Sequence, residues 1–201
     1  MKKLTFEAFV KANEQKLEEI RSTAWNLHES VGQKYDRNLP YGHHLSMAAN
    51  AAFSYGHQVI DNEFDFIPVV FAAYFHDSIE DARLTYRDVI SVASQFMTEE
   101  QSVIAAEIVY ALTNDKGRTR SERAGEKYYA GIRETPYAPF VKLCDRLANM
   151  TYSCSSGNNH MSEVYESEWP HFIEAITVRN EDKRFSLPEG MIIEIQSMLS
   201  E

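Results

Sequence analysis

Apolar residues recur with helical spacing along most of the chain. Over residues 5–29 they return every three or four positions between charged residues, which predicts an amphipathic helix that covers a core. Residues 41–57 predict a second helix, whose many small residues permit close approach to a neighbour. Residues 67–73 are apolar throughout, so we expect a buried central helix that continues into the polar residues 74–81.

Two further predicted helices begin at recognisable caps. Thr85 is followed three residues later by Asp88, and Thr98 is followed in the same way by Gln101, which is the spacing of a capping box. The helix after Thr98 is expected to turn its apolar positions inward and to break at residues 113–117.

The last third of the chain also favours helices. Residues 140–150 predict a strong helix, and residues 153–159 are rich in Ser, Gly and Asn, which predicts a loop. Residues 160–179 form a long amphipathic segment with a kink expected at Pro170. A short closing helix is predicted over residues 188–199.

The pattern as a whole predicts an all-α protein, a compact bundle of roughly eight to ten helices. No period-two alternation of apolar and polar residues is long enough to build a sheet. With 201 residues and 44% hydrophobic content the chain can bury a substantial core, and we predict a single domain over residues 1–201.

The formal net charge of -10 argues against binding partners that are themselves negatively charged. Nucleic acids and anionic membranes attract a positive field, so we expect neither as a partner. The two cysteines, Cys144 and Cys154, lack the spacing of a disulfide framework or a zinc ribbon, which favours a reducing compartment. We recognise no signal peptide and no stretch that could span a membrane, and therefore predict a cytoplasmic protein.

Candidate chemistry concentrates at residues 76–81, which read His-Asp-Ser-Ile-Glu-Asp. On a helix, His76 would share a face with Glu80, and Asp77 would share it with Asp81. Three carboxylates so close together repel one another, and a divalent metal bound by the imidazole and one carboxylate would offset that repulsion. The other carboxylates would then be available for proton transfer. The alternative is an acidic helix end with a solvated histidine.

Further candidate ligands lie in two other predicted helices. His44 is near the start of the second helix, and Asp145 shares a face of a later helix with Asn149. Together with His76 and Asp77 they would converge in the core of the bundle. Two imidazoles and two carboxylates suit a six-coordinate ion such as Mn or Fe better than a structural zinc ion, which usually takes thiolates.

Basic residues gather after the predicted break. Six of the 20 lysines and arginines fall between positions 116 and 133: Lys116, Arg118, Arg120, Arg123, Lys127 and Arg133. Glutamates are interleaved with them, so a solvated helix face is one interpretation. Beside an acidic metal site, a strip that binds phosphate groups is the other.

The three motif segments, in this order and spacing, resemble the HD phosphohydrolase superfamily, whose signature is an early His, a His-Asp pair and a late Asp. More narrowly, the chain resembles the alarmone hydrolases, which include the hydrolase domain of the Rel/Spo enzymes and small stand-alone hydrolases. Residues 40–44 match their Pro-Tyr-x-x-His, which selects His44 over His43. Residues 76–81 match His-Asp-x-x-Glu-Asp, and residues 142–149 match Lys-Leu-Ala-Asp-Arg-Leu-x-Asn with one Ala-to-Cys change.

The resemblance covers residues 33–152, and residues 153–201 are expected to add C-terminal helices. It implies an HD-domain helical bundle and an enzyme that removes pyrophosphate from the ribose 3' position of guanosine tetra- or pentaphosphate, (p)ppGpp. It implies one metal ion, Mn with Fe or Co as alternatives, and four ligands to it: His44, His76, Asp77 and Asp145. The residues implied to orient and deprotonate the attacking water are Glu80 and Asp81.

The resemblance also implies which residues contact a phosphorylated nucleotide substrate. Lys116, Arg123 and Lys127 are expected to bind its phosphates, and Asn149 its ribose or 3' oxygen. Tyr35 is expected to stack on the base, although the family usually has an arginine at this position.

Two alternative functions remain open. An HD-type nucleotidase would use the same metal ligands with a smaller phosphate pocket, and it would need fewer basic residues than the chain supplies between positions 116 and 133. Removal of a phosphate group from NADPH is a related possibility. A catalytically silent module that senses nucleotides is less favoured, because all four ligands and both acids are present.

Overall fold

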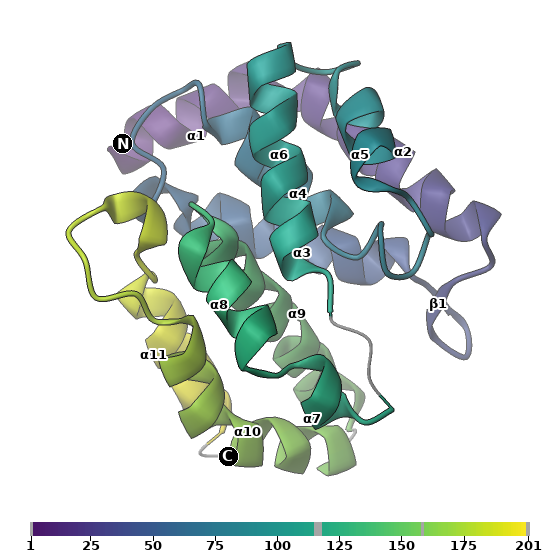
Figure 1. Ribbon diagram of the computed structural model, residues 1–201, viewed down its shortest axis with the longest axis vertical. Coiled ribbons are helices and arrows are strands. Elements are labelled where there is room, and N and C mark those ends of the chain that lie inside the picture. The colour runs from purple at the N-terminus through teal and green to yellow at the C-terminus, as the bar shows by residue number, and fades with distance from the viewer. Residues whose placement is uncertain (1, 115–117, 158, 200–201) are drawn as a thin grey trace.

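The computed structural model describes residues 2–114, 118–157 and 159–199, and helices account for most of them (Figure 1). The prediction of an all-α fold is confirmed. The α-helices are α1 (Lys3–Ala12), α2 (Glu14–Ser30), α3 (Gly42–Tyr55), α4 (Phe66–Phe75), α5 (Tyr86–Ala93), α6 (Glu99–Leu112), α7 (Arg120–Arg123), α8 (Glu126–Glu134), α9 (Ala138–Ser156), α10 (Asn159–Ile176) and α11 (Glu189–Met198). Short 3-10 helices cover Gly56–Gln58 and Lys183–Phe185.

Both predicted helix starts are present, and each forms a capping box. The Thr85 hydroxyl accepts the backbone N–H of Asp88 at the start of α5, and the Asp88 carboxylate accepts the backbone N–H of Thr85. Thr98 and Gln101 exchange the same pair of bonds at the start of α6. These caps satisfy backbone N–H groups that have no partner within the helix, so local sequence fixes where α5 and α6 begin.

The helix predicted over residues 5–29 is instead two helices. The chain leaves α1 at Asn13, whose side-chain amide donates to the carbonyl oxygen of Phe9 at 2.9 Å. Asparagine competes for backbone groups in this way, which favours the end of a helix over its continuation. The apolar spacing carries on through the break and therefore does not reveal it.

The loop predicted over residues 153–159 is also wrong in part, because α9 continues to Ser156. Helix α9 ends at Gly157, whose φ of 68° lies in the left-handed region of backbone conformation. Glycine adopts this conformation without a steric penalty because it has no Cβ atom. The predicted closing helix is present as α11, and Pro170 lies inside α10.

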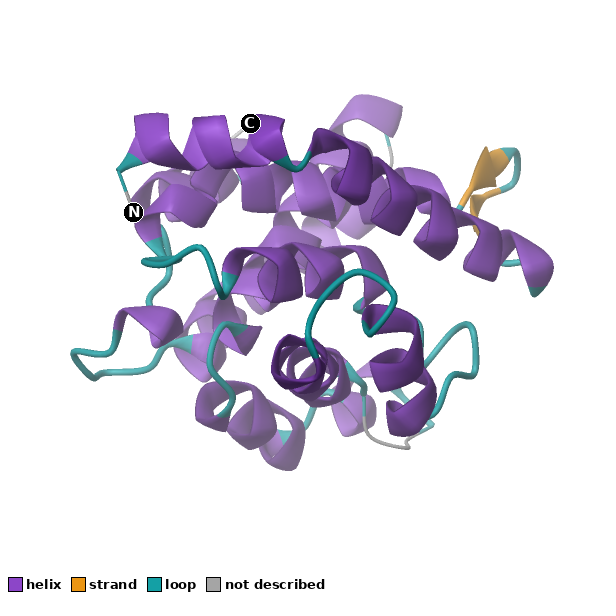
Figure 2. Cartoon of the chain, turned by 90° about the horizontal axis from the view of Figure 1, so that it is seen from above, coloured by secondary structure: helices purple, strands orange, loops and turns teal. Residues whose placement is uncertain are grey.

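Residues 33–40, between α2 and α3, contain a small hairpin. Strands β1 (Lys34–Asp36) and β2 (Leu39–Pro40) pair antiparallel, with Lys34 opposite Pro40 and Asp36 opposite Leu39. The hairpin lies at the edge of the molecule (Figure 2). It is tied to α9 by the Tyr152 hydroxyl, which donates to Asp36 Oδ2 at 2.7 Å.

Helix α4 forms the centre of the core. Every residue from Phe66 to Phe75 is buried, as expected for a helix that is apolar on all sides. Helices α2, α3, α6 and α9 pack against it. One cluster of buried side chains extends from Phe6 in α1 to Ile195 in α11. This continuity supports the single-domain prediction, which stays a prediction.

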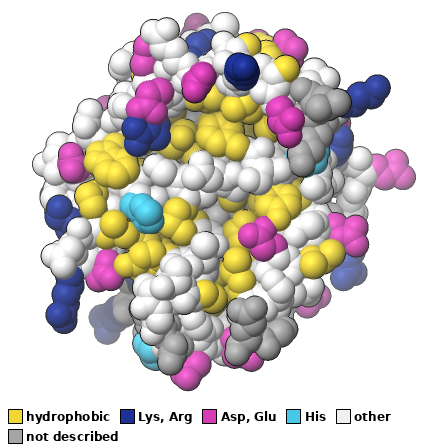
Figure 3. Space-filling model, turned by 180° about the vertical axis from the view of Figure 1, so that it is seen from behind, with side chains coloured by type: hydrophobic (Ala, Val, Ile, Leu, Met, Phe, Trp, Pro, Cys, Tyr) yellow, Lys and Arg dark blue, Asp and Glu magenta, His cyan; other side chains and the backbone are white. Residues whose placement is uncertain are grey.

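The surface is mixed in character. On the face shown in Figure 3, hydrophobic side chains lie mainly toward the middle, and acidic and basic side chains lie mostly around the rim with the two signs intermixed. In the part of the chain that the structure describes, no helix is both long and apolar enough to cross a membrane.

Candidate metal centre

The polar residues that follow α4 form a series of turns, which corrects the prediction that the central helix continues through residue 81. The Ser78 N–H donates to the carbonyl oxygen of Phe75 at 2.9 Å, and the Asp81 N–H donates to that of Asp77 at 2.8 Å. Like charges at Asp77 and Asp81 disfavour a further regular helical turn. The turns leave His76 and Asp77 at the end of the buried helix, in the interior of the bundle.

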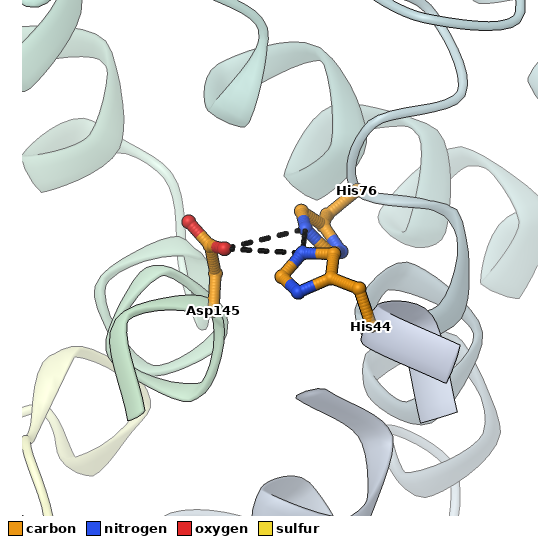
Figure 4. Close-up of side chains that lie close together, drawn as sticks. All are labelled: His44, His76 and Asp145. Atoms are coloured by element: carbon orange, nitrogen blue, oxygen red, sulfur yellow. Dashed lines mark hydrogen bonds and ion pairs between the residues drawn. The ribbon is translucent and has the colours of Figure 1, made fainter. Parts of the chain in front are cut away.

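Three predicted ligands from distant segments meet there. His44 lies on α3, His76 follows α4 and Asp145 lies on α9, and their ligand atoms are within 4.8 Å of one another. Figure 4 shows the Asp145 carboxylate facing the two imidazole rings. The two Nε2 atoms are 3.1 Å apart. Asp145 Oδ1 lies 3.3 Å from the Nε2 atom of His44 and 3.6 Å from that of His76.

The fourth predicted ligand joins the same cluster. Asp77 Oδ2 lies 2.9 Å from His76 Nε2 and 3.6 Å from His44 Nε2. The two histidine side chains are 2% exposed, whereas the carboxylates of Asp77 and Asp145 are 21% and 13% exposed. The structure therefore places all four sequence-predicted ligands together, with the two carboxylates more exposed to solvent than the two imidazoles.

The donor set fits a divalent metal ion. His76 Nδ1 lies 2.9 Å from the carbonyl oxygen of Ala73, which can only accept, so Nδ1 carries a hydrogen and Nε2 is the nitrogen that is left to bind an ion. Two imidazole nitrogens and two carboxylate oxygens that converge at such short distances require a cation between them, either a proton or a metal. Imidazole and carboxylate are ligands that Mn, Fe and Co accept.

The electrostatics of the cluster favour the charged forms of its members. Burial by itself favours neutral imidazoles, but Asp77 and Asp145 outweigh it and raise the pKa of His44, and that of His76 well above its usual value. Burial also opposes charged carboxylates, yet His76 holds the pKa of Asp77 well below its usual range, and Lys142 does so for Asp145. A bound cation would take the place of the histidine protons.

Two residues that the sequence analysis did not assign hold the carboxylates in place. The Tyr41 hydroxyl donates to Asp77 Oδ2 at 2.6 Å, and Lys142 Nζ donates to Asp145 Oδ2 at 2.9 Å. Such contacts orient metal ligands and are part of how a protein builds a metal site. The available signals were the place of Tyr41 in the Pro-Tyr-x-x-His motif and the three-residue spacing of Lys142 from Asp145 on a helix.

The two predicted acids lie beside the cluster. Asn114 Nδ2 donates to Glu80 Oε2 at 2.8 Å, which fixes the carboxylate against the end of α6. Partial removal from water, followed by the nearby charge of Asp77, raises the pKa of both Glu80 and Asp81. A raised pKa makes each carboxylate a better proton acceptor once it is ionised.

A cavity of about 800 Å³ adjoins the cluster. Its lining includes three of the predicted metal ligands together with acidic, basic, amide and aromatic side chains: Tyr41, His44, Asp77, Glu80, Asp81, Asn114, Arg123, Tyr128, Tyr129, Lys142, Asp145, Arg146, Asn149, Tyr165, Glu168, His171 and Phe172. This volume suits a small molecule such as a nucleotide.

The predicted substrate residues are distributed unevenly around this cavity. Arg123 and Asn149 belong to its lining, whereas Tyr35 and Lys127 do not. Lys116 lies outside the described residues.

Some basic residues have structural contacts instead. Arg133 Nη1 donates to the carbonyl oxygen of Ala175 at 2.7 Å and so ties α8 to α10. Arg146, which is 7% exposed, donates to Glu168 at 3.0 Å, and its guanidinium lies 4.7 Å from the ring centre of Tyr165 and 4.2 Å from that of Phe172. Arg146 and Glu168 both line the cavity, and their contact forms its wall along α10.

Comparison with known proteins supports the fold. No protein-family model matches the sequence, and neither does any curated protein. Among solved structures, the chain is similar to a metazoan ortholog of SpoT that hydrolyzes ppGpp and plays a role in starvation responses. The TM-score is 0.60 at 17% sequence identity, over 92% of this chain and 94% of that chain. The chain therefore has the fold of this metazoan protein over nearly the whole length of both.

Proposed function

We propose that the chain is a metal-dependent phosphohydrolase and that its substrate is (p)ppGpp, from which it releases the 3' pyrophosphate. The observation that carries this proposal is the convergence of His44, His76, Asp77 and Asp145 beside a cavity that Glu80 and Asp81 also line. The shared fold with a metazoan ppGpp hydrolase and the match of three sequence motifs support the choice of substrate.

In the proposed mechanism the metal ion activates the phosphoryl group and the water, and side chains of the protein accept the proton and orient the water. When bound, the metal ion supplies Lewis acidity that polarises a phosphoryl group and acidifies water. Glu80 has one carboxylate oxygen held by Asn114 and can accept the proton of the attacking water with the other. Asp81 lines the cavity at the following position and can orient the same water.

The residues that line the cavity suggest contacts to the substrate. Arg123, the last residue of α7, lines the cavity, and its guanidinium is suited to a phosphate group. The roles of Lys116 and Lys127 as further phosphate contacts stay predictions, as do those of Tyr35 for the base and Asn149 for the ribose. The identity of the ion, with Mn first and Fe or Co as alternatives, and a cytoplasmic location also stay predictions.

The first test is product analysis. Mn-loaded protein is incubated in parallel with guanosine tetraphosphate, a 5' nucleoside monophosphate and NADPH. We expect pyrophosphate and guanosine diphosphate from the first substrate, and no release of phosphate from the other two. The Asp77→Asn variant, prepared in the same way, serves as the control for a contaminating phosphatase.

Each other outcome points to a named alternative. Release of inorganic phosphate from the monophosphate or from NADPH alone would replace the proposed substrate with that of a nucleotidase or an NADPH phosphatase. Tight binding of guanosine tetraphosphate without turnover would favour a nucleotide-sensing module.

A further inference from the structure

The hairpin between α2 and α3 reaches the metal centre through one side chain, Tyr35 of β1. Its ring stacks on the imidazole of His44, with ring centres 4.8 Å apart and an interplanar angle of 21°. Its hydroxyl donates to Asn149 Oδ1 at 3.0 Å. A single residue outside the helical bundle therefore contacts one metal ligand directly and a neighbour of another.

The stacking contact matters because His44 is held differently from His76. A histidine that binds a metal usually donates its second ring N–H to an acceptor, which fixes the orientation of the ring. His76 follows this rule through the carbonyl oxygen of Ala73. Within the described residues, His44 Nδ1 is buried and has no hydrogen-bond partner. Its ring is instead enclosed by Tyr35 on one face and by Tyr41 edge-on, at 5.4 Å and 62°.

The hydroxyl contact leads to the second ligand. The Asn149 side chain lies 2.6 Å from Asp145 Oδ1 and 3.1 Å from the carbonyl oxygen of Asp145. Both are acceptors, so the NH₂ group of Asn149 must face them and its oxygen must face Tyr35. The Tyr35 hydroxyl is the donor that this amide orientation requires. Two consecutive hydrogen bonds therefore connect the hairpin to the Asp145 oxygen that faces both histidines.

Two contacts with Tyr152 of α9 also hold Tyr35 in position. The neighbouring Asp36 accepts the Tyr152 hydroxyl, and the rings of Tyr35 and Tyr152 have centres 4.7 Å apart. The hairpin is thus docked on α9 by one tyrosine–carboxylate bond that does not involve the metal ligands.

We infer that Tyr35 is a positioning residue of the metal centre, which orients His44 by stacking and Asp145 through Asn149. The inference rests on the metal site of the proposed function. It assigns the Tyr35 hydroxyl to metal binding, a role that stacking on a nucleotide base would not need.

The test is a Mn²⁺ titration of the metal-free full chain, with the free ion measured by electron paramagnetic resonance. Tyr35→Phe keeps the ring and removes the hydroxyl, and we expect it to weaken Mn²⁺ binding by about tenfold, the lower end of the effect of losing an outer contact to a metal ligand. At saturating Mn²⁺ we expect kcat to return to nearly the wild-type value and KM to be unchanged.

Tyr152→Phe is the matched control, because it removes the other hydroxyl that ties the hairpin to α9, the one that donates to Asp36, and leaves the bond from Tyr35 to Asn149 in place. We expect its Mn²⁺ affinity to be within about twofold of wild type, well inside the effect expected for a residue in the relay. Thermal unfolding of both variants shows whether either has lost the fold.

The inference is overturned if Tyr35→Phe binds Mn²⁺ as tightly as wild type, or if Tyr152→Phe weakens binding equally. In the second case the loss of Mn²⁺ affinity comes from weaker docking of the hairpin on α9 and not from the lost hydrogen bond to Asn149. If the wild-type chain itself retains no Mn²⁺, it is the proposed metal site that fails, and the two failures are thereby distinguished.

Discussion

At the scale of the residue, two carboxylates only three positions apart face different partners. Asp77 accepts the Tyr41 hydroxyl and lies within 3.6 Å of both histidine Nε2 atoms, whereas Glu80 is held by Asn114 on the cavity wall. These positions fit the proposed roles of Asp77 as a metal ligand and of Glu80 as the general base.

This division predicts opposite behaviour for two isosteric substitutions. Asp77→Asn should abolish both metal retention and turnover, because it removes a negative charge from the ligand set. Glu80→Gln should retain the metal and lower kcat by about 10²–10⁴-fold, the usual contribution of a general base. Metal content by mass spectrometry and kcat on guanosine tetraphosphate check both. Full activity in Glu80→Gln would refute its proposed role.

The histidines predict how metal affinity depends on pH. The pKa values of His44 and His76 are raised by the neighbouring carboxylates, so in the metal-free protein these imidazoles keep their protons to a higher pH than an ordinary histidine does. An ion needs the unprotonated Nε2 atoms, and its binding must release these protons. We therefore expect affinity to rise with pH up to the raised pKa values, by up to about tenfold per pH unit for each proton released.

The measurement is a set of Mn²⁺ titrations from about pH 6 to 9, a range that starts near the ordinary histidine pKa of about 6.5 and extends above it. Proton release on binding is followed in weakly buffered solution. Affinity that is constant over this range would contradict the expectation.

At the scale of the element, the placement of His44 depends on how closely α3 approaches α2. Gly42 is buried at the start of α3, and a Cβ atom added there would lie 2.2 Å from the ring of Trp25 on α2. Either the helix or the indole would have to move. Because His44 is only two residues away on the same helix, this contact also helps to fix the position of His44.

Gly42→Ala should therefore lower the free energy of unfolding by about 1–3 kcal/mol, the usual cost of overpacking a core. Gly131→Ala is the matched control, since Gly131 lies in the middle of α8 with nothing within 4 Å of an added Cβ. There we expect stabilisation by about 0.5–1 kcal/mol from the better helix propensity of alanine. Urea unfolding measures both, and equal effects of the two substitutions would argue against the close approach of α3 to α2.

At the scale of the whole molecule, the proposed metal centre joins segments far apart in the chain. The proposed ligands come from α3, the turns after α4, and α9, all of which pack around the same core. An ion that binds only the folded chain stabilises it by about 2.7 kcal/mol when the free ion is present at about 100 times its Kd.

Removal of the ion should consequently lower Tm. For a chain of this size each kcal/mol corresponds to about 2–4 °C, so we expect chelation to lower Tm by about 5–11 °C. Differential scanning calorimetry with Mn²⁺ and with excess chelator gives the shift. The Asp77→Asn variant should unfold at the same temperature in both conditions, and a shift of similar size in that variant would assign the stabilisation to another site.

The sequence by itself determined the helical class, the starts of α5 and α6, and the four ligand candidates. These features depend on local chemistry: apolar periodicity, hydrogen bonds between a cap and a residue three positions on, and side chains able to bind a metal. The motif spacing indicated that His44, the His76–Asp77 pair and Asp145 act together, and the structure brings them together.

The tertiary structure decided what depends on contacts between distant segments. Only the fold shows that the residues after α4 form turns, that Arg133 joins α8 to α10, and that Arg123 reaches the cavity. Tyr35 is the clearest case, since its contacts with His44 and Asn149 cross from the hairpin to α3 and α9. Periodicity and motifs describe neighbours along the chain, and these contacts arise only when the bundle packs.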